Sequence, residues 1–452
     1  IMRALGVVDI DYRSYIKDDK QAPISPSNVD MHALTGYKRV FILGSYVRHE
    51  QPMLGARLRK AVLGGVDAVS INPREYLWNF PLKDAFCVGG QAMVQLLHAV
   101  CAEVVKKTKF VLSKKWQACM DTAIHTSESK RLARYALHGE NCWMLGSYLY
   151  SHPQASIIRT FVDIIVKATS SYVWHLTPGA NSLGLQAVGA TPFSGPQGEI
   201  VQQGNGVDIA IQSDKKLLWL HQLEPEFDMY NAKQAMRALE KAEFVVQCTS
   251  SVSDTMYAYA DVLLPITPHT EMRGTLVNTF GHVQAFTPTQ TPYANSRPAW
   301  KIYRVLGALL QLDDFEFSSI EAVRDAMGPI TFPAQVDRLT APDIMHIKPN
   351  TMLERVGEVP LYREDVITRR ADALQATIAS DVACARIHPI TAKNMSIHEG
   401  ECTFAMGDCR FSCHVLIDSS IALGVVWLPS ALVETCDYGD RHGDLKLIRA
   451  GH

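Results

Sequence analysis

Residues 39–73 read "RVFILGSYVRHEQPMLGARLRKAVLGGVDAVSINP", and residues 141–178 repeat their pattern as "NCWMLGSYLYSHPQASIIRTFVDIIVKATSSYVWHLTP". Each stretch runs from an apolar strand through Gly-Ser-Tyr and a polar loop with proline to an amphipathic helix and a second strand. The helical spacing is clear at Leu54, Leu58 and Ala61. Because strand-helix-strand units build parallel sheets with right-handed crossovers, the repeat predicts an α/β fold.

A third unit of the same kind follows the repeat. It begins with the apolar run 215–225, continues through a helical pattern at 230–242, and ends in the strand-like stretch 243–250. The run "ADVLLPI" at 260–266 adds another strand. This alternation predicts doubly wound parallel sheets, and the spacing of the first two units along the chain favours two lobes.

After about residue 330 the composition changes. A stretch rich in proline and charge reads as a connection, and short alternating strands between turn residues then predict a small β-barrel. We therefore expect five regions: the tail of an upstream domain at 1–36, a first Rossmann-like lobe at 37–135, a second α/β lobe at 136–330, a connecting segment at 331–380, and a C-terminal β-barrel at 381–452.

Composition narrows the class of protein. The chain has 452 residues, 47% hydrophobic and 20% charged, which suits a globular protein of about three domains. Its 44 Lys and Arg balance 46 Asp and Glu, so no overall field favours nucleic acid or an anionic membrane. Apolar runs stay well short of a bilayer span, and we expect no direct membrane insertion. The chain begins at Ile1 without a signal-peptide pattern, and we interpret it as a downstream piece of a longer protein.

The ten cysteines and sixteen histidines encode no familiar metal motif. The cysteines include no C-x-x-C pair, and the histidines form no H-E-x-x-H, so we expect structural roles for them. Cys409 and Cys413 lie in a strand-like stretch and are interpreted as packing residues of one face. Free thiols in a chain of this size point to a reducing compartment.

Three strand-end loops are candidate ligand-binding loops. They follow Leu43, Leu145 and Leu223, at the carboxyl edge where open α/β sheets bind ligands. The loops with Ser45 and Ser147 each offer one glycine and a hydroxyl, which falls short of G-x-G-x-x-G. Binding of a nucleotide there remains an alternative.

The loop 269–284, "HTEMRGTLVNTFGHVQ", is a further candidate. It combines two glycines, which permit close backbone approach, with three short polar side chains: Gly274, Gly281, Thr275, Asn278 and His282. The combination suits a cradle for a polar cofactor, and it equally suits an ordinary tight loop.

Four segments in order resemble the large subunits of the molybdopterin oxidoreductase superfamily. Residues 41–61 are similar to that family's Gly-Ser-Asn-Pro loop and helix, and residues 177–192 to its Asn-Gly segment. Residues 242–286 are similar to its strongest signature, "ADVVLP...e..GT..N", and residues 385–406, followed by "GVVWLPSAL", to its C-terminal barrel. The resemblance covers nearly the whole chain.

Within that superfamily the chain is most similar to the C-terminal part of the large iron-sulfur subunits of bacterial NADH:quinone oxidoreductase, respiratory complex I. Arg48 and Glu50, followed by "PMLGARLRKA", resemble their "PR.EaP.l.aRiRka". Residues 2–19 resemble the segment just after their cluster-binding domain.

This resemblance implies a part in electron transfer from NADH to quinone. The 2Fe-2S and 4Fe-4S clusters would lie in the missing upstream region, and this portion would hold no cluster and no molybdopterin. Its implied partners are other peripheral-arm subunits, including the flavin-bearing NADH-oxidising subunit, and no nucleic acid. The implied location is the cytoplasmic face of the bacterial inner membrane, or the matrix side in mitochondria.

One departure from the superfamily pattern favours a structural role. In members similar to formate dehydrogenase, the segment resembling residues 9–20 carries a Cys or selenocysteine beside the metal, near Ile16–Asp18 in this chain. Lys17 has no lone pair as an ammonium and cannot replace a thiolate, and Ser14 would be a weak substitute. We therefore expect no catalytic, cofactor-binding or metal-binding residues here. The alternatives are an active molybdopterin enzyme of the formate dehydrogenase or nitrate reductase type and a free-standing nucleotide-binding module.

Overall fold

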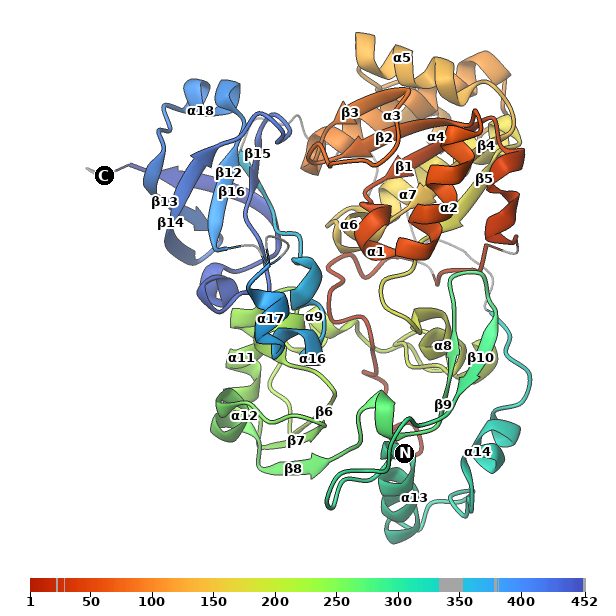
Figure 1. Cartoon of the computed structure of the whole chain (residues 1–452), viewed down its shortest axis with the longest axis vertical. Coiled ribbons are helices and arrows are strands. Elements are labelled where there is room, and N and C mark those ends of the chain that lie inside the picture. Colours follow the sequence, from red (N-terminus) through yellow and green to blue (C-terminus); the bar gives the residue numbers. More distant parts are fainter. Residues whose placement is uncertain (22, 28, 333–352, 378–379, 381, 450–452) are drawn as a thin grey trace.

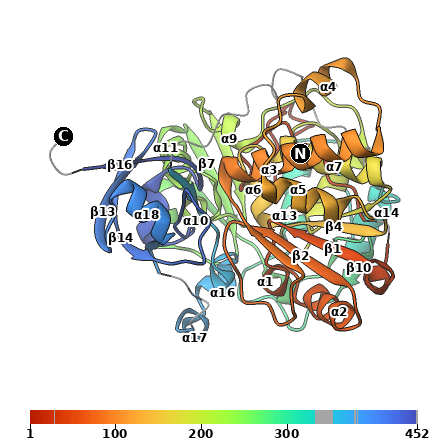
Figure 2. The same ribbon diagram turned by 90° about the horizontal axis from the view of Figure 1, so that it is seen from above.

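The computed structural model describes residues 1–449 apart from 22, 28, 333–352, 378–379 and 381. Figure 1 shows three bodies: an α/β lobe built from the first part of the chain, a smaller lobe below it, and a C-terminal barrel at its side. Seen from above in Figure 2, the barrel and the first lobe lie next to each other, with the second lobe behind them. The predicted class, parallel α/β sheets with a C-terminal β-barrel, is confirmed.

The first lobe contains one five-stranded parallel sheet in the order β3-β2-β1-β4-β5. Its central strands are buried at every position, as expected for a parallel sheet covered on both faces. The strands are β1 (Arg39–Leu43), β2 (Asp67–Asn72), β3 (Asp84–Cys87), β4 (Asn141–Leu145) and β5 (Tyr172–His175).

Helices cover both faces of this sheet. Phe41 and Leu43 point to one face, where they pack with the long helices α3 (Gly90–Thr108), α5 (Ser127–Ala136) and α7 (Ala155–Thr169). The alternate residues of β1 pack on the other face with η1 (Met31–Gly36) and α2 (Pro52–Leu63). Three short helices complete the lobe: α1 (Val47–Glu50), α4 (Lys114–Met120) and α6 (Ser147–Ser151).

The expected division at residues 135 and 136 is wrong. The two repeated units were expected in separate lobes, but β4 of the second unit pairs in parallel with β1 of the first, with Leu43 opposite Leu145. Both units therefore share one sheet. Distance along the chain misled the prediction, because the crossover through α3 and α5 is long enough to bring β4 back beside β1.

The second lobe contains the predicted third unit as a three-stranded parallel sheet in the order β6-β7-β8. These strands are β6 (Leu217–His221), β7 (Phe244–Thr249) and β8 (Val262–Pro265). The predicted helix is α11 (Ala232–Lys241), which begins where the side chain of Asn231 accepts a hydrogen bond from the Gln234 amide. The other elements of this region are α8 (Ser182–Ala187), η2 (Pro196–Gly198), α9 (Val207–Ala210), α10 (Pro225–Asp228), α12 (Asp254–Tyr259), η3 (His269–Glu271), the hairpin β9 (Gly274–Val277) and β10 (Val283–Phe286), α13 (Ala299–Leu309) and α14 (Ile320–Met327).

The C-terminal body is a closed barrel of six strands around an apolar core. In spatial order they are β11 (Leu353–Val356), β15 (Val425–Trp427), β12 (Cys384–Ile387), β14 (Cys409–Ile417), β13 (Gly400–Met406) and β16 (His442–Ile448). Around them lie η4 (Leu361–Arg363), α16 (Val366–Arg369), α17 (Asp372–Gln375), α18 (Pro389–Met395) and η5 (Val433–Tyr438).

The barrel begins earlier than predicted. Strand β11 lies within the segment 331–380, which was expected to be only a connection, yet it closes the barrel between β15 and β16. Residues 333–352 of that segment lie outside the described residues. The boundary at 381 is therefore wrong, because a four-residue strand with two charged side chains does not stand out from a charged background.

Strand β11 also joins the barrel to the first lobe. A carboxylate oxygen of Glu354 accepts a hydrogen bond of 2.7 Å from the Gln91 amide at the start of α3. This position suits an anion, since the first amides of a helix lack intrahelical partners. Burial nevertheless raises the pKa of Glu354 to about 7, the Gln91 amide lowers it in part, and Asp444 adds repulsion.

Replacing this carboxyl group is expected to change the pH dependence of stability. The folded pKa lies above that of an exposed glutamate, so the stability due to Glu354 is present at low pH and is lost as pH rises from about 4.5 to about 7. Relative to wild type, Glu354→Gln is expected to gain up to about 3 kcal/mol of unfolding free energy between pH 5 and 8. Urea unfolding at several pH values measures this, with the exposed-site variant Glu434→Gln as control. Parallel pH profiles for wild type and Glu354→Gln would contradict it.

Candidate functional site

A cleft of about 1000 Å³ lies where the N-terminal tail, both α/β lobes and the barrel meet. Tyr46 enters it just after β1, Ser147 just after β4, and Leu223 just after β6. The three predicted strand-end loops therefore converge, as the carboxyl edges of parallel strands do. Trp427 contributes the barrel side of the wall.

The wall of the cleft mixes opposite charges with aromatic rings. Its cations are all arginines, from the first lobe and the barrel region: Arg48, Arg74, Arg369, Arg386 and Arg441. An equal number of carboxylates faces them: Glu50, Glu75, Asp228, Glu358 and Glu364. Such a lining offers hydrogen bonds in both senses and does not by itself favour an anion over a cation.

Glu50 holds two of the strand-end loops together. One oxygen accepts a hydrogen bond of 2.8 Å from the Tyr46 amide, and the other accepts from the amide and the hydroxyl of Ser147 at 3.0 Å each. Burial raises the pKa of Glu50, and the donated hydrogen bonds partly offset that rise. Ser147, predicted as a candidate phosphate-binding residue, is therefore bound to a carboxylate, and an incoming phosphate would meet Glu50.

A stacked wall of rings and guanidinium groups faces these loops. The rings of Tyr46 and Tyr76 stack with centroids 4.5 Å apart, and Arg74 lies 4.4 Å from the centre of the Trp427 ring. Glu358 accepts hydrogen bonds from the Tyr76 hydroxyl and from the Trp427 indole, the latter at 2.8 Å. These contacts link the first lobe to the barrel across the cleft.

Several groups of the opposite wall have shifted pKa values. Burial, followed by repulsion from Glu50, raises the pKa of Glu364 to about 7. Burial lowers the pKa of Arg441 to about 10, although Asp228 opposes that shift. Arg369 lies against Glu224 at 2.9 Å and also bonds Asp228, so this wall is fixed by ion pairs.

Residues 9–20, which resemble a metal-ligating region, lie only partly at the cleft. Ser14 lines it, whereas Lys17 points to another set of side chains. The Lys17 ammonium lies 3.0 Å from Asp208 of α9 and 3.4 Å from Asp440, just before β16. Burial alone would lower the pKa of Lys17, but the two carboxylates raise it above its ordinary value. Lys17 is therefore protonated and has no lone pair to offer a metal.

The glycine-rich loop 269–284 forms a hairpin outside the residues that line the cleft. Asn278 accepts hydrogen bonds of 3.0 Å from the amides of Phe280 and His282, as expected for a residue that caps peptide groups. Gly281 has φ +83°, as a turn requires. Gly274 permits a close approach, because a β-carbon there would lie 2.4 Å from the Phe286 ring.

Other predicted candidates also have structural roles. Cys409 and Cys413 lie in β14 as expected, and Cys413 packs in the barrel core. Within the described part of the chain, His, Cys, Asp and Glu side chains form no group of three or more that could hold a metal ion. None of the described helices is both long enough and apolar enough to span a bilayer.

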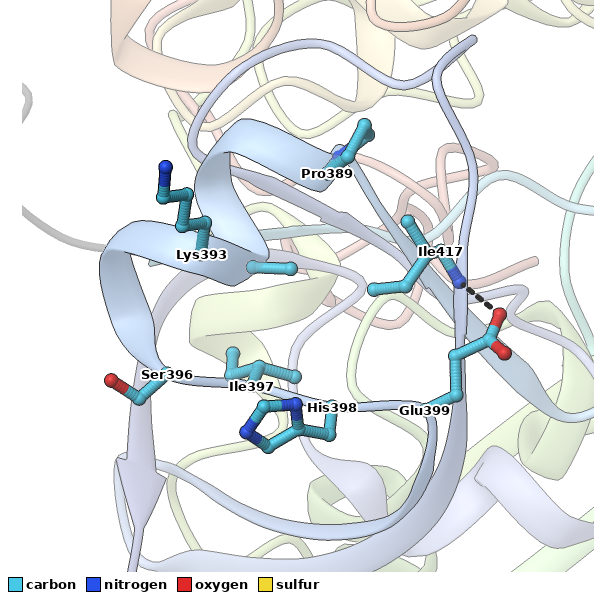
Figure 3. A pocket seen from close by; sticks show the side chains of 8 residues that line it. Pro389, Lys393, Ser396, Ile397, His398, Glu399 and Ile417 are labelled. Carbon is cyan, nitrogen blue, oxygen red and sulfur yellow. Dashed lines mark hydrogen bonds between the residues drawn. The ribbon is translucent and has the colours of Figure 1, made fainter.

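A second hollow, of about 690 Å³, lies on the barrel surface beside α18 (Figure 3). In Figure 3 the Ile417 amide donates a hydrogen bond of 3.0 Å to Glu399. Lys393 and Ser396 point outward in Figure 3. The hollow is distant from the strand-end loops, so the candidate site is the central cleft.

Comparison with known proteins identifies the family. Residues 26–309 match the family model "Molybdopterin oxidoreductase", which is more than half of the chain. The chain belongs to the molybdopterin oxidoreductase family. The matches to curated relatives are shorter: a protein from Staphylococcus haemolyticus named "Putative formate dehydrogenase" is 32% identical over 101 residues, and one of the same name from Staphylococcus aureus is 34% identical over 101 residues. Each match covers 22% of this chain and 10% of the relative.

The fold of this molybdopterin oxidoreductase family member is also found in acetylene hydratase from Pelobacter acetylenicus. The two structures superpose with a TM-score of 0.61 over 93% of this chain and 80% of the hydratase, at 11% sequence identity. That similarity supports the fold alone.

The family's metal-pterin group fits the cleft poorly. No cysteine is among the residues that line it, and the raised pKa of Lys17 leaves that side chain without a lone pair. Ser14 and His49 are among the neutral oxygen and nitrogen donors that line the cleft. The lining residues therefore offer no soft thiolate ligand for a metal.

Sequence reasoning missed the cleft residues contributed by the barrel and by the segment before it. Trp427 lies in a stretch that was recognised as barrel, and Arg74 directly follows the second strand of the first unit, where a strand-end position could have drawn attention to it. Arg369 and Glu364 lie in the region interpreted as a connection, and no spacing in the sequence singles them out.

The contact between the two Gly-Ser-Tyr loops predicts a severe effect of Gly146→Ala. A β-carbon at Gly146 would lie 2.2 Å from the Ser45 β-carbon and 2.6 Å from the Gly44 carbonyl oxygen, and this backbone cannot move without disturbing β1. We expect a loss of about 2–4 kcal/mol of unfolding free energy, measured by urea denaturation. Gly139→Ala is the matched control, because no heavy atom lies within 4 Å of its β-carbon. Equal stability of the two variants would refute this packing argument.

Proposed function

We propose that this chain is a non-catalytic, structural portion of the large iron-sulfur subunit of NADH:quinone oxidoreductase, respiratory complex I. The observation that carries the proposal is the state of Lys17. Where catalytic relatives present sulfur or selenium to a metal, this chain holds an ammonium between Asp208 and Asp440. The resemblance of residues 2–19, and of Arg48 and Glu50 with the following "PMLGARLRKA", to that subunit supplies the particular complex.

The ion pairs of Lys17 give the N-terminal tail a structural role. Lys17 belongs to the N-terminal tail, Asp208 to the second lobe, and Asp440 to the barrel, so one side chain joins three parts of the molecule. Its ammonium also lies 5.6 Å from the centre of the Tyr230 ring. In the proposed complex this portion braces the peripheral arm, while electrons pass through clusters held by the upstream region. Its partners would be other peripheral-arm subunits, at the cytoplasmic face of the bacterial inner membrane or on the matrix side in mitochondria.

A second candidate function is an active molybdopterin-dependent oxidoreductase of the formate dehydrogenase type. The names of the curated relatives favour it, and so does Ser14, whose hydroxyl lines the cleft and is an oxygen donor. In that case the group would supply redox chemistry at the cleft, and Ser14 would be a candidate oxygen ligand to its metal. The free-standing nucleotide-binding module is less well supported, since Glu50 occupies the Ser147 amide and hydroxyl.

Metal analysis separates the two candidates. The chain is produced in cells that make molybdenum cofactor, purified, and measured by inductively coupled plasma mass spectrometry together with fluorescence of oxidised pterin. The structural role predicts far less than one molybdenum or tungsten per chain, because no thiolate is offered. A stoichiometric metal that is lost in Ser14→Ala, with dye-linked formate oxidation, would establish the second candidate instead.

A further inference from the structure

A lysine-rich segment connects α3 to α4 on the first lobe. Residues 106–116 read "KKTKFVLSKKW", in which five of eleven residues are lysine and none is acidic. The whole chain carries a formal charge of −2, so this is a local concentration of positive charge against a balanced background. Figure 2 shows α4 at the outer edge of the first lobe, far from the barrel.

The segment is firmly anchored, and its charges face solvent. Phe110, Leu112 and Trp116 pack against the apolar core of the first lobe. Lys109 has φ +55° and ends α3, and Ser113 begins α4 by accepting a hydrogen bond from the Trp116 amide. The loop is therefore held in one shape by three apolar anchors and a helix cap.

The exposed side of this segment combines charge with an uncovered aliphatic group. All five lysines are exposed, and only Lys107 has an ion pair among the described residues, at 4.0 Å from Glu103. Val111 projects between them with 89% of its surface exposed. Ile124, just beyond α4, is 75% exposed. Val111 is thus an exposed apolar side chain among four lysines that have no ion pair within the described residues.

We propose that the segment 106–116 is a contact site for a membrane surface bearing anionic phospholipids. Long lysine stems can lie along the headgroup region while their ammonium groups pair with phosphates, and Val111 would enter the boundary of the acyl chains. Each lysine near such a surface strengthens binding roughly fivefold at low salt. The site is peripheral and does not depend on the role proposed for the cleft.

Two other kinds of partner fit the segment less well. Protein interfaces are enriched in arginine and aromatic residues and depleted in lysine, whereas every cation here is lysine. Single-stranded nucleic acid needs free aromatic faces for stacking, but Phe110 and Trp116 are packed against the core.

Vesicle co-sedimentation of the whole chain tests the proposal. The chain should pellet with vesicles of phosphatidylcholine and phosphatidylglycerol at low salt, and not with phosphatidylcholine alone or at high salt. Lys114→Glu combined with Lys115→Glu should weaken binding by at least about 25-fold, and Val111→Asp by roughly fivefold. The matched control reverses two exposed lysines elsewhere, Lys241→Glu and Lys393→Glu, and should bind as wild type. Thermal unfolding verifies that all variants are folded.

Three results would overturn the proposal. The first is a failure to pellet with phosphatidylglycerol vesicles at low salt. The second is an equal loss of binding in the control variant, which would indicate a response to net charge alone. The third is binding of a polyuridine oligonucleotide or of polyglutamate without binding of vesicles, which would assign the segment to nucleic acid or to an acidic protein.

Discussion

The parallel pairing of β1 with β4 is the constraint on which the arrangement of the cleft depends. It brings the two Gly-Ser-Tyr loops to one sheet edge, where the Glu50 carboxylate binds backbone amides of both. A buried carboxylate is stable only when hydrogen bonds replace its lost hydration, and here three donors do so. These hydrogen bonds to Glu50 fix the distance between the two loops, and the other walls of the cleft surround them.

Side chains from distant parts of the chain then close the cleft. Arg74 stacks on Trp427, and Glu358 accepts hydrogen bonds from Tyr76 and Trp427, so the barrel is held to the first lobe. On the other side Lys17 joins the tail to the second lobe and the barrel. The tail, both lobes and the barrel thus meet at the cleft, and several of its polar groups bond one another, as Glu50 does with Ser147 and Glu358 with Tyr76.

The sequence was sufficient to predict strands, helices and fold class where apolar periodicity was strong. The repeat at 39–73 and 141–178 has continuous apolar strands, and the structure contains them. Periodicity does not report which strands pair, so β4 was placed in the wrong lobe. Strand β11 was missed because Glu354 and Arg355 read as surface residues, although both are buried among partners from β16 and the first lobe. Likewise, the chemistry of Lys17 was readable from its residue type, but its partners Asp208 and Asp440 were not.

The position of β11 in the barrel has a consequence for biosynthesis. This strand pairs with β16, which follows every other described strand of the barrel in the sequence. During translation the other barrel strands leave the ribosome before β16. The edges of β11 and β13 that pair with β16 would therefore stay unpaired until β16 is synthesised. The apolar interior of the barrel is therefore exposed to chaperones and to other nascent chains for most of its own translation, and a premature stop near the C-terminus would leave that edge unpaired.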